Sequence, residues 1–137
     1  MKSLLLIALA VLSLQLLRTE KISDLESIED VTTFTIKSMV VDPNPPKRAK
    51  KATTTIVYTS SVPQPVSKVH IDSYLNGGKV DGRDVQNVVT MEADKEYTWV
   101  YSDTIPIIAP PGNYKVEYKF MDPTGKQLGM IVNEFKL

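Results

Sequence analysis

The sequence predicts an all-β domain, an immunoglobulin-like β-sandwich of about seven antiparallel strands. From Thr33 onward, short runs rich in Val, Ile, Thr and Tyr are separated by clusters of Pro, Gly, Asn and Asp. This pattern is typical of strands joined by turns. The clearest strand is 114–120, where apolar side chains alternate strictly with charged ones. Such alternation predicts one buried and one solvated face.

The remaining strands follow from the same pattern. The segment 34–41 changes its apolar parity midway, which predicts a bulge or a change of side, and the prolines of 42–46 cannot pair in a sheet. Asn76-Gly77-Gly78 and 122–125 are strong turn signals, and the second predicts a closing hairpin. In 79–91 we expect only a short irregular strand and a loop. The other strands are expected at 53–60, 66–75, 95–108 and 127–137.

The N-terminus has the pattern of a secretory signal peptide. Lys2 precedes an apolar run, Leu4–Leu12, which is shorter than the roughly 20 residues that span a bilayer. We therefore expect a signal peptide at 1–18, a leader segment at 19–32 and one domain at 33–137. The mature protein is expected to be secreted to the extracellular space or to reach the lumen of the endosomal-lysosomal system.

Composition argues against several classes of function. The chain has no cysteine and a single histidine, and its 16 basic and 16 acidic residues give no net charge. Thiol chemistry and Cys- or His-rich metal sites are excluded, and no overall field attracts nucleic acid. The sequence has no G-x-S-x-G elbow, no Walker loop and no H-E-x-x-H motif. We expect no enzyme, no catalytic residue, no cofactor and no metal.

Two segments resemble a known family. They are Ile36–Pro46 (IKSMVVDPNPP) and a stretch within Tyr101–Phe135 (TIPIIAPPGNYKVEYKFMDPTGKQL). Both are similar to the ML lipid-recognition domain family, which includes secreted phosphatidylglycerol/phosphatidylinositol transfer proteins and the Niemann-Pick type C cholesterol carrier. The resemblance implies a non-catalytic lipid binder, an immunoglobulin-like β-sandwich with a cavity between the sheets that holds the apolar part of the ligand. Family members normally carry disulfides, whereas this chain has Met130 about where the closing strand usually supplies a cysteine.

A lipid between the sheets requires an apolar lining, because each buried methylene contributes about 0.8 kcal/mol. The apolar positions of the predicted inner faces supply the candidates. An equally simple interpretation is that they form a filled sandwich core, since alternation shows burial but not an empty space beside it. The candidate lining residues are Val69, Ile71, Tyr97, Trp99, Ile105, Ile107, Val116, Tyr118 and Phe120.

A basic run follows the prolines of 42–46. Lys47, Arg48, Lys50 and Lys51 are candidates to contact a lipid headgroup or an anionic membrane, where each charge contributes about 1 kcal/mol. The alternative is a solvated loop. His70 is either a group that titrates in an acidic compartment or an exposed strand residue.

The leading hypothesis is a secreted, monomeric lipid-binding or lipid-transfer protein. It would hold a phospholipid, sterol or fatty acid and contact membranes transiently. One alternative is a non-catalytic extracellular protein-interaction module, and another is a cofactor that presents lipid to a degradative enzyme. A cavity of several hundred Å³, typical of ligand sites, would favour lipid binding, and a filled core would favour the interaction module.

Overall fold

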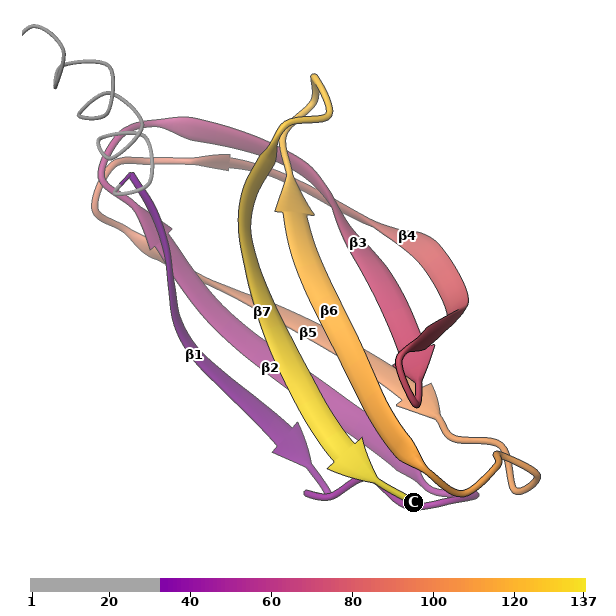
Figure 1. Cartoon of the computed structure of the whole chain (residues 1–137). Coiled ribbons are helices and arrows are strands. Elements are labelled where there is room, and N and C mark those ends of the chain that lie inside the picture. Colours follow the sequence, from indigo (N-terminus) through magenta and orange to yellow (C-terminus); the bar gives the residue numbers. More distant parts are fainter. Residues whose placement is uncertain (1–32) are drawn as a thin grey trace, which may run out of the picture. The chain divides into compact units, whose positions relative to one another are not determined.

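The computed structural model describes residues 33–137, which form seven antiparallel strands in two sheets without a helix (Figure 1). The predicted β-sandwich is confirmed. The expected signal peptide (1–18) and leader segment (19–32) lie outside the described residues. Among the described residues, none belongs to a helix long and apolar enough to cross a membrane.

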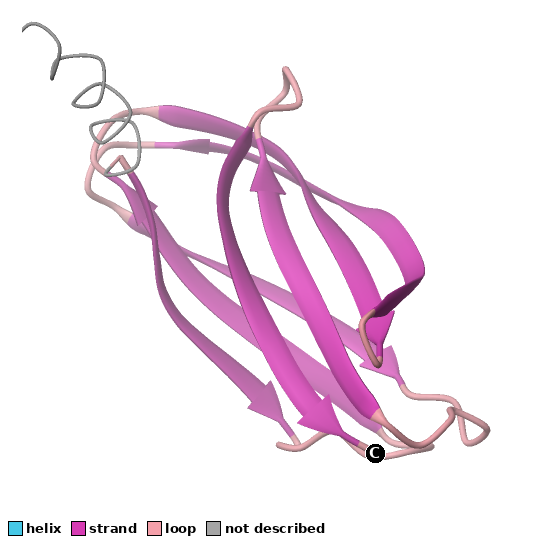
Figure 2. Cartoon of the chain, in the orientation of Figure 1, coloured by secondary structure: helices cyan, strands magenta, loops and turns pink. Residues whose placement is uncertain are grey.

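The two sheets contain three and four strands. In the first sheet the order is β1 (Phe34–Asp42), β2 (Lys51–Ser60) and β5 (Glu96–Thr104). In the second it is β4 (Gly78–Met91), β3 (Gln64–Leu75), β6 (Asn113–Met121) and β7 (Gln127–Lys136). The chain therefore passes from one sheet to the other after β2, β4 and β5, through the loops drawn in pink in Figure 2. This is an immunoglobulin-like sandwich in which the fourth strand pairs with the third.

The change of parity predicted in the first strand is a β-bulge. The pairing of β1 with β2 shifts between Ile36 and Ser38, leaving Lys37 unpaired. One extra residue reverses which side chains face the core. The bulge thus lets Phe34 and Ile36 at one end, and Met39 at the other, pack against the same core.

The expectation of a short irregular strand and a loop at 79–91 was wrong. β4 is one continuous strand of 14 residues, and it pairs with β3 from one end to the other with register shifts at Val66/Lys68 and Ser73/Tyr74, so the strand is irregular as expected but is neither short nor part loop. Its first seven residues are all exposed, and burial on alternate residues begins only at Val85. β4 is an edge strand, so its first half pairs through its backbone and shows no hydrophobic alternation in the sequence.

The fifth strand is shorter than the expected 95–108. β5 ends at Thr104, and Ile105 makes an isolated parallel bridge to Arg48 of the β1–β2 loop. Pro106 has no N–H to continue a ladder. Residues 105–112 consequently form a loop, which leads into β6.

Both predicted turns are present. Leu75 pairs with Gly78 across Asn76 and Gly77, whose φ angles are 50° and 88°. Two successive positive φ angles define the two-residue hairpin turn that Asn-Gly favours. In the β6–β7 turn, Asp122 accepts hydrogen bonds from the backbone amides of Thr124 and Lys126. The closing hairpin is confirmed.

An aromatic cluster fills one half of the space between the sheets. Tyr58 lies 4.8 Å from Phe120 and 5.7 Å from Phe34 between ring centroids, and Trp99 meets Phe120 edge-on at 6.0 Å. Gly129 of β7 makes room for Phe34, because a Cβ there would lie 2.8 Å from the ring. This contact brings β1 over β7 and closes one side of the sandwich.

Candidate functional site: a pocket between the sheets

A pocket of about 200 Å³ lies between the two sheets, in the half that the aromatic cluster leaves free. All seven strands contribute to its walls, and the β1–β2 loop, the β5–β6 loop and Leu137 border it at one end of the domain. Its apolar lining includes Val41, Ile71, Val80, Ile105, Val116, Tyr118 and Phe135.

The pocket exists because small side chains replace the aromatic rings at this end. Ala52 and Thr54 continue the inner face of β2 beyond Ile56, and Ser73 continues that of β3 beyond Ile71. Alternate residues of a strand point to the same face, so these side chains also face inward. They are too short to meet across the sandwich, and the space between them stays open.

Two hydroxyl groups lie at the inner end of the pocket. Thr54 and Tyr118, both buried, belong to different sheets, and their oxygens are 3.3 Å apart. Burial raises the pKa of the Tyr118 phenol above its usual value, so the phenol is neutral at physiological pH. One of the two hydroxyls donates to the other, and both line the pocket with further hydrogen-bonding capacity.

A polar latch joins the sheets along one side of the pocket. Arg83 of β4 donates to Asp81 at 2.9 Å on its own strand. Across the gap to β5 it donates to the Tyr101 hydroxyl at 3.2 Å and to Asp103 at 3.4 Å. The hydrogen bond to Asp81, followed by that to Tyr101, raises the pKa of Arg83. β4 and β5 share no backbone pairing, so these contacts hold this side closed.

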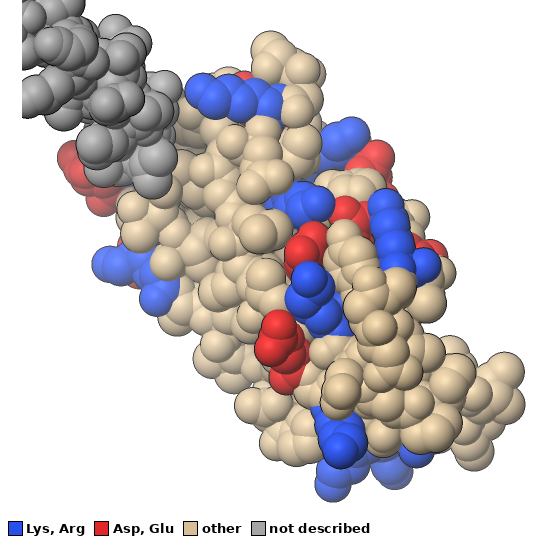
Figure 3. Space-filling model, viewed as in Figure 1, with Lys and Arg blue, Asp and Glu red and all other residues tan. Residues whose placement is uncertain are grey.

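The predicted basic run lies at the same end of the domain as the pocket. Arg48 donates from Nε to the carbonyl of Ala109 at 2.8 Å, and the Ala49 amide donates to the carbonyl of Ile105 at 2.7 Å. Ile105 and Ala109 both line the pocket. Figure 3 shows Lys and Arg side chains gathered at the end where β1 and β7 terminate. Lys47, Lys50 and Lys51 are exposed.

The structure separates the candidate lining residues into three groups. Ile71, Ile105, Val116 and Tyr118 line the pocket, and all of them except Ile105 also pack in or against the hydrophobic core. Those placed only in or beside the filled core, away from the pocket lining, are Val69, Tyr97, Trp99 and Phe120. Ile107 is 72% exposed in the β5–β6 loop, outside the lining, because the strand on which its inward position was expected ends before it.

Several lining residues were not anticipated. Thr54 has the inward parity of Ile56 and Tyr58, so the sequence pattern contained the signal for it. Arg83 and Asp81 lie in the segment expected to be partly loop, and their contacts with β5 depend on long-range pairing. Phe135 and Tyr114 stack at 5.4 Å between centroids, a contact that the predicted hairpin brings together but does not identify.

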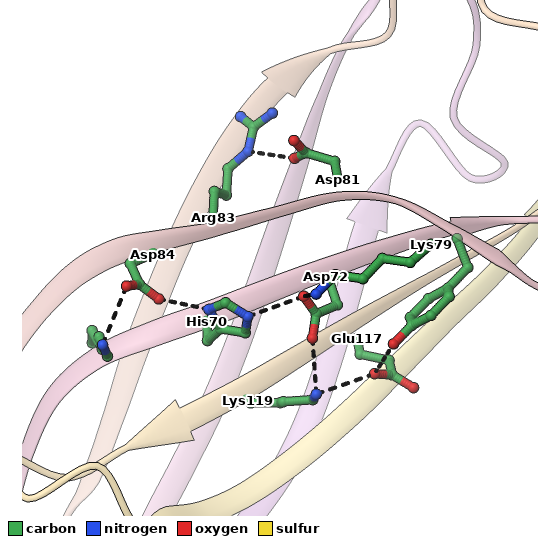
Figure 4. Close-up of polar contacts among 10 residues, drawn as sticks. His70, Asp72, Lys79, Asp81, Arg83, Asp84, Glu117 and Lys119 are labelled. Atoms are coloured by element: carbon green, nitrogen blue, oxygen red, sulfur yellow. Dashed lines mark hydrogen bonds and ion pairs between the residues drawn. The ribbon is translucent and has the colours of Figure 1, made fainter.

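His70 belongs to a charged network drawn in Figure 4. His70 alternates with the core residues Val69 and Ile71 along β3, so it lies on the outer face of the four-stranded sheet. Its ring lies between Asp84, 2.6 Å from Nδ1, and Asp72, 3.0 Å from Nε2. Asp72 also accepts from Lys119 at 2.9 Å and pairs with Lys79 at 3.0 Å. The hydrogen bond from Lys119 is the main cause that lowers the pKa of Asp72 to about 2.

This network has a structural role in joining three strands of the sheet. Gly82 faces Asp72 in the pairing of β4 with β3, and a Cβ at Gly82 would lie 2.9 Å from the Asp72 carboxylate. The absence of a side chain at Gly82 therefore leaves room for the Asp72 carboxylate between Lys79 and Lys119. Within residues 33–137, no group of three or more His, Cys, Asp or Glu side chains is arranged to hold a metal ion.

The fold of the domain is shared with proteins of known structure. A Niemann-Pick type C2 protein from the Japanese carpenter ant superposes with a TM-score of 0.60 at 11% identity, over 76% of this chain and 92% of that one. The sporulation control protein Spo0M of Bacillus subtilis superposes with a TM-score of 0.57 at 9% identity over 77% of this chain. No family model matches the sequence, and no curated protein does either.

A third similar structure shows how widely the sandwich is used. The alkylpurine DNA glycosylase AlkC of Pseudomonas fluorescens superposes with a TM-score of 0.57 at 17% identity over 77% of this chain. The chain spans about half the length of the Spo0M structure (48%) and under a third of AlkC (30%). At these identities the likeness establishes the fold alone, and the function has to be argued from the pocket.

Proposed function

We propose that this protein is a non-catalytic lipid carrier that holds the apolar tail of one lipid in the pocket between its sheets. The observation that carries the proposal is the pocket itself: it has apolar walls from all seven strands, a short polar inner end and a border of loops. Apolar walls with a few convergent polar groups are the usual form of a small-molecule site. The likeness in fold to the Niemann-Pick type C2 protein supports the same function.

The size of the pocket favours a slim tail over a rigid ring system. Its volume of about 200 Å³ exceeds the ~150 Å³ cavity that accommodates benzene, but it is below the ~300–1,000 Å³ of common ligand sites. A flexible acyl chain can enter such a pocket and leave its head at the loops, whereas a sterol needs the sheets to part further. We therefore propose a fatty acid or phospholipid as the ligand ahead of a sterol.

The proposed setting is the extracellular space or the endosomal-lysosomal lumen. The expected signal peptide would direct the carrier there, and it would act as a monomer.

A second candidate function is a non-catalytic interaction module. It is favoured by the outer face of the three-stranded sheet, where Val40 and Val100 are 60% and 59% exposed.

A pocket-filling variant tests the proposal. Val116→Phe places a ring in the pocket, and Val100→Phe places the same ring on the outer face of the other sheet. Carriage predicts that Val116→Phe abolishes uptake of a fluorescent fatty acid, while Val100→Phe takes it up as the unaltered chain does. Equal uptake by both folded variants would exclude this pocket as the lipid site.

A further inference from the structure

The hydroxyls of Thr54 and Tyr118 together hold one hydrogen more than their contact uses. Their oxygens are 3.3 Å apart, and either oxygen can be the donor. Each hydroxyl carries a single hydrogen, so one O–H lies in the shared hydrogen bond and the other is left over, whichever residue donates. Within residues 33–137 neither hydroxyl has a second hydrogen-bond partner. One O–H donor of this pair is therefore unsatisfied.

The unsatisfied donor is buried beside apolar side chains. Thr54 and Tyr118 are only 4% and 6% exposed. Ile71 pairs with Tyr118 across β3 and β6, Val116 precedes Tyr118 on the same face, and both line the pocket. A buried donor without an acceptor has lost its hydrogen bond to water and gained nothing in return, so nearly all such groups in folded proteins are paired. The pocket beside the pair is the open space from which an acceptor can reach it.

The other polar side chains of the pocket are less deeply buried. Ser73, Tyr101 and Asn133 are half-buried, and the charged side chains of the lining are exposed. Solvent can therefore pair with these groups when the pocket is empty. The Thr54–Tyr118 pair is consequently the polar group of the lining that depends most on what occupies the pocket.

From this unsatisfied donor we infer that the carried lipid has a keto oxygen in the part of its tail that lies in the pocket. The inference rests on the proposed function and narrows its ligand to an oxygenated chain. The head of the ligand is proposed to stay at the loops, so an acceptor at the inner end has to belong to the tail. A carbonyl oxygen accepts and brings no hydrogen of its own, whereas a carboxylate would lose its hydration beside apolar walls. A keto chain therefore pairs the donor that the two hydroxyls leave over.

Two competitors of equal chain length test the inference with the full chain. Both are decanoic acids that displace a fluorescent fatty acid: the keto acid has an oxo group on its penultimate carbon, and the methyl acid has a methyl branch there. Thr54→Val/Tyr118→Phe removes both hydroxyls and nearly keeps the shapes of the side chains. Thr55→Val/Tyr74→Phe makes the same two changes on the outer faces of the two sheets.

The measured quantity is the affinity for the keto acid divided by that for the methyl acid. Thr54→Val/Tyr118→Phe should lower this ratio about tenfold, because only the keto acid loses a buried hydrogen bond. Comparing the ratio between chains cancels the different hydration of the two acids. The outer-face variant should keep the ratio of the unaltered chain. An unchanged ratio in Thr54→Val/Tyr118→Phe, or an equal fall in the control, would overturn the inference, since water or another side chain would then satisfy the donor.

A spectroscopic measurement on the unaltered chain keeps the test independent of how the variants fold. Infrared difference spectra of the keto acid, isotope-labelled at its oxo carbon, report the C=O stretching band. The band of the bound acid should lie at the lower frequency of a hydrogen-bonded ketone. A band at the frequency that the same keto group shows in hexane would contradict the inference.

The outcomes separate this inference from the proposed function. Displacement by the methyl acid reports on carriage without an acceptor in the tail. Uptake of both acids at a ratio that neither variant changes would overturn the inference and leave carriage intact. A chain that takes up neither the fluorescent fatty acid nor the keto acid would contradict carriage and this inference together.

Discussion

The hydroxyl oxygens of Thr54 and Tyr118 lie 3.3 Å apart and join the two sheets at the inner end of the pocket. A buried hydroxyl left without its partner costs about 1 kcal/mol, whereas removing both partners together costs less. We expect Tyr118→Phe and Thr54→Val each to lower the free energy of unfolding by about 1 kcal/mol. The double variant should lose less than the sum, as measured by urea denaturation. Strictly additive losses would mean that the two hydroxyls do not interact.

The latch between β4 and β5 should control how fast a ligand enters. Arg83→Gln removes the contacts with Tyr101 and Asp103, and the partly exposed ion pair contributes at most about 1 kcal/mol. We expect fatty-acid uptake to become up to about fivefold faster in stopped-flow fluorescence. Lys79→Gln is the control, because this residue of the same strand pairs with Asp72 on the outer face. An unchanged rate in Arg83→Gln would place the entry route elsewhere.

Acid stability should depend on Asp72. Its pKa is lowered from 3.8 to about 2, chiefly by the hydrogen bond from Lys119. A carboxyl whose pKa is lower in the folded state stabilises the fold above its unfolded pKa, and this stability is lost as the pH falls through the folded pKa. Asp72→Asn should therefore reduce stability by about 1 kcal/mol near neutral pH, allowing for solvent screening. The difference should fade between pH 3.8 and about 2. A difference that stays constant over that range would contradict this assignment.

The contact of Gly129 with Phe34 predicts an intolerant position on β7. A Cβ at Gly129 would lie 2.8 Å from one ring atom of Phe34 and 3.0 Å from another, and overpacking of a core typically costs about 1–3 kcal/mol. We expect Gly129→Ala to lower the unfolding midpoint in urea accordingly. Gly78→Ala is the matched control, because its Cβ would meet only the Leu75 carbonyl at 3.7 Å. Equal stability of the two variants would show that Phe34 moves aside freely.

The sequence pattern predicts the layers of this fold well, because burial on one face of a strand leaves an alternation. The strict alternation of 114–120 and the parity change in 34–41 both correspond to observed features, β6 and the bulge in β1. The first half of β4 left no such signal, since its side chains are exposed and their contacts are polar, so burial leaves no alternation in the sequence. An edge strand with exposed side chains can be assigned only once the neighbouring strand with which its backbone pairs is known.

The pocket could be predicted only in part, because alternation identifies a face and not a volume. Val69 and Ile71 share a face of β3 and both belong to the buried core, yet only Ile71 also lines the pocket. The difference depends on what lies opposite: an aromatic cluster in one half of the sandwich, and Ala52 and Thr54 in the other. Which side chains face each other depends on how the two sheets pack, and the sequence of one strand does not contain that information.

The account depends most on the occupation of the pocket by lipid. The most direct measurement is native mass spectrometry of the purified chain, followed by lipid extraction, with Val116→Phe as the matched pocket-filled variant. Carriage predicts one fatty acid or phospholipid bound per chain, and none on the variant. A chain that is empty and remains empty after incubation with fatty acids, phospholipids and sterols would contradict carriage and favour the interaction module.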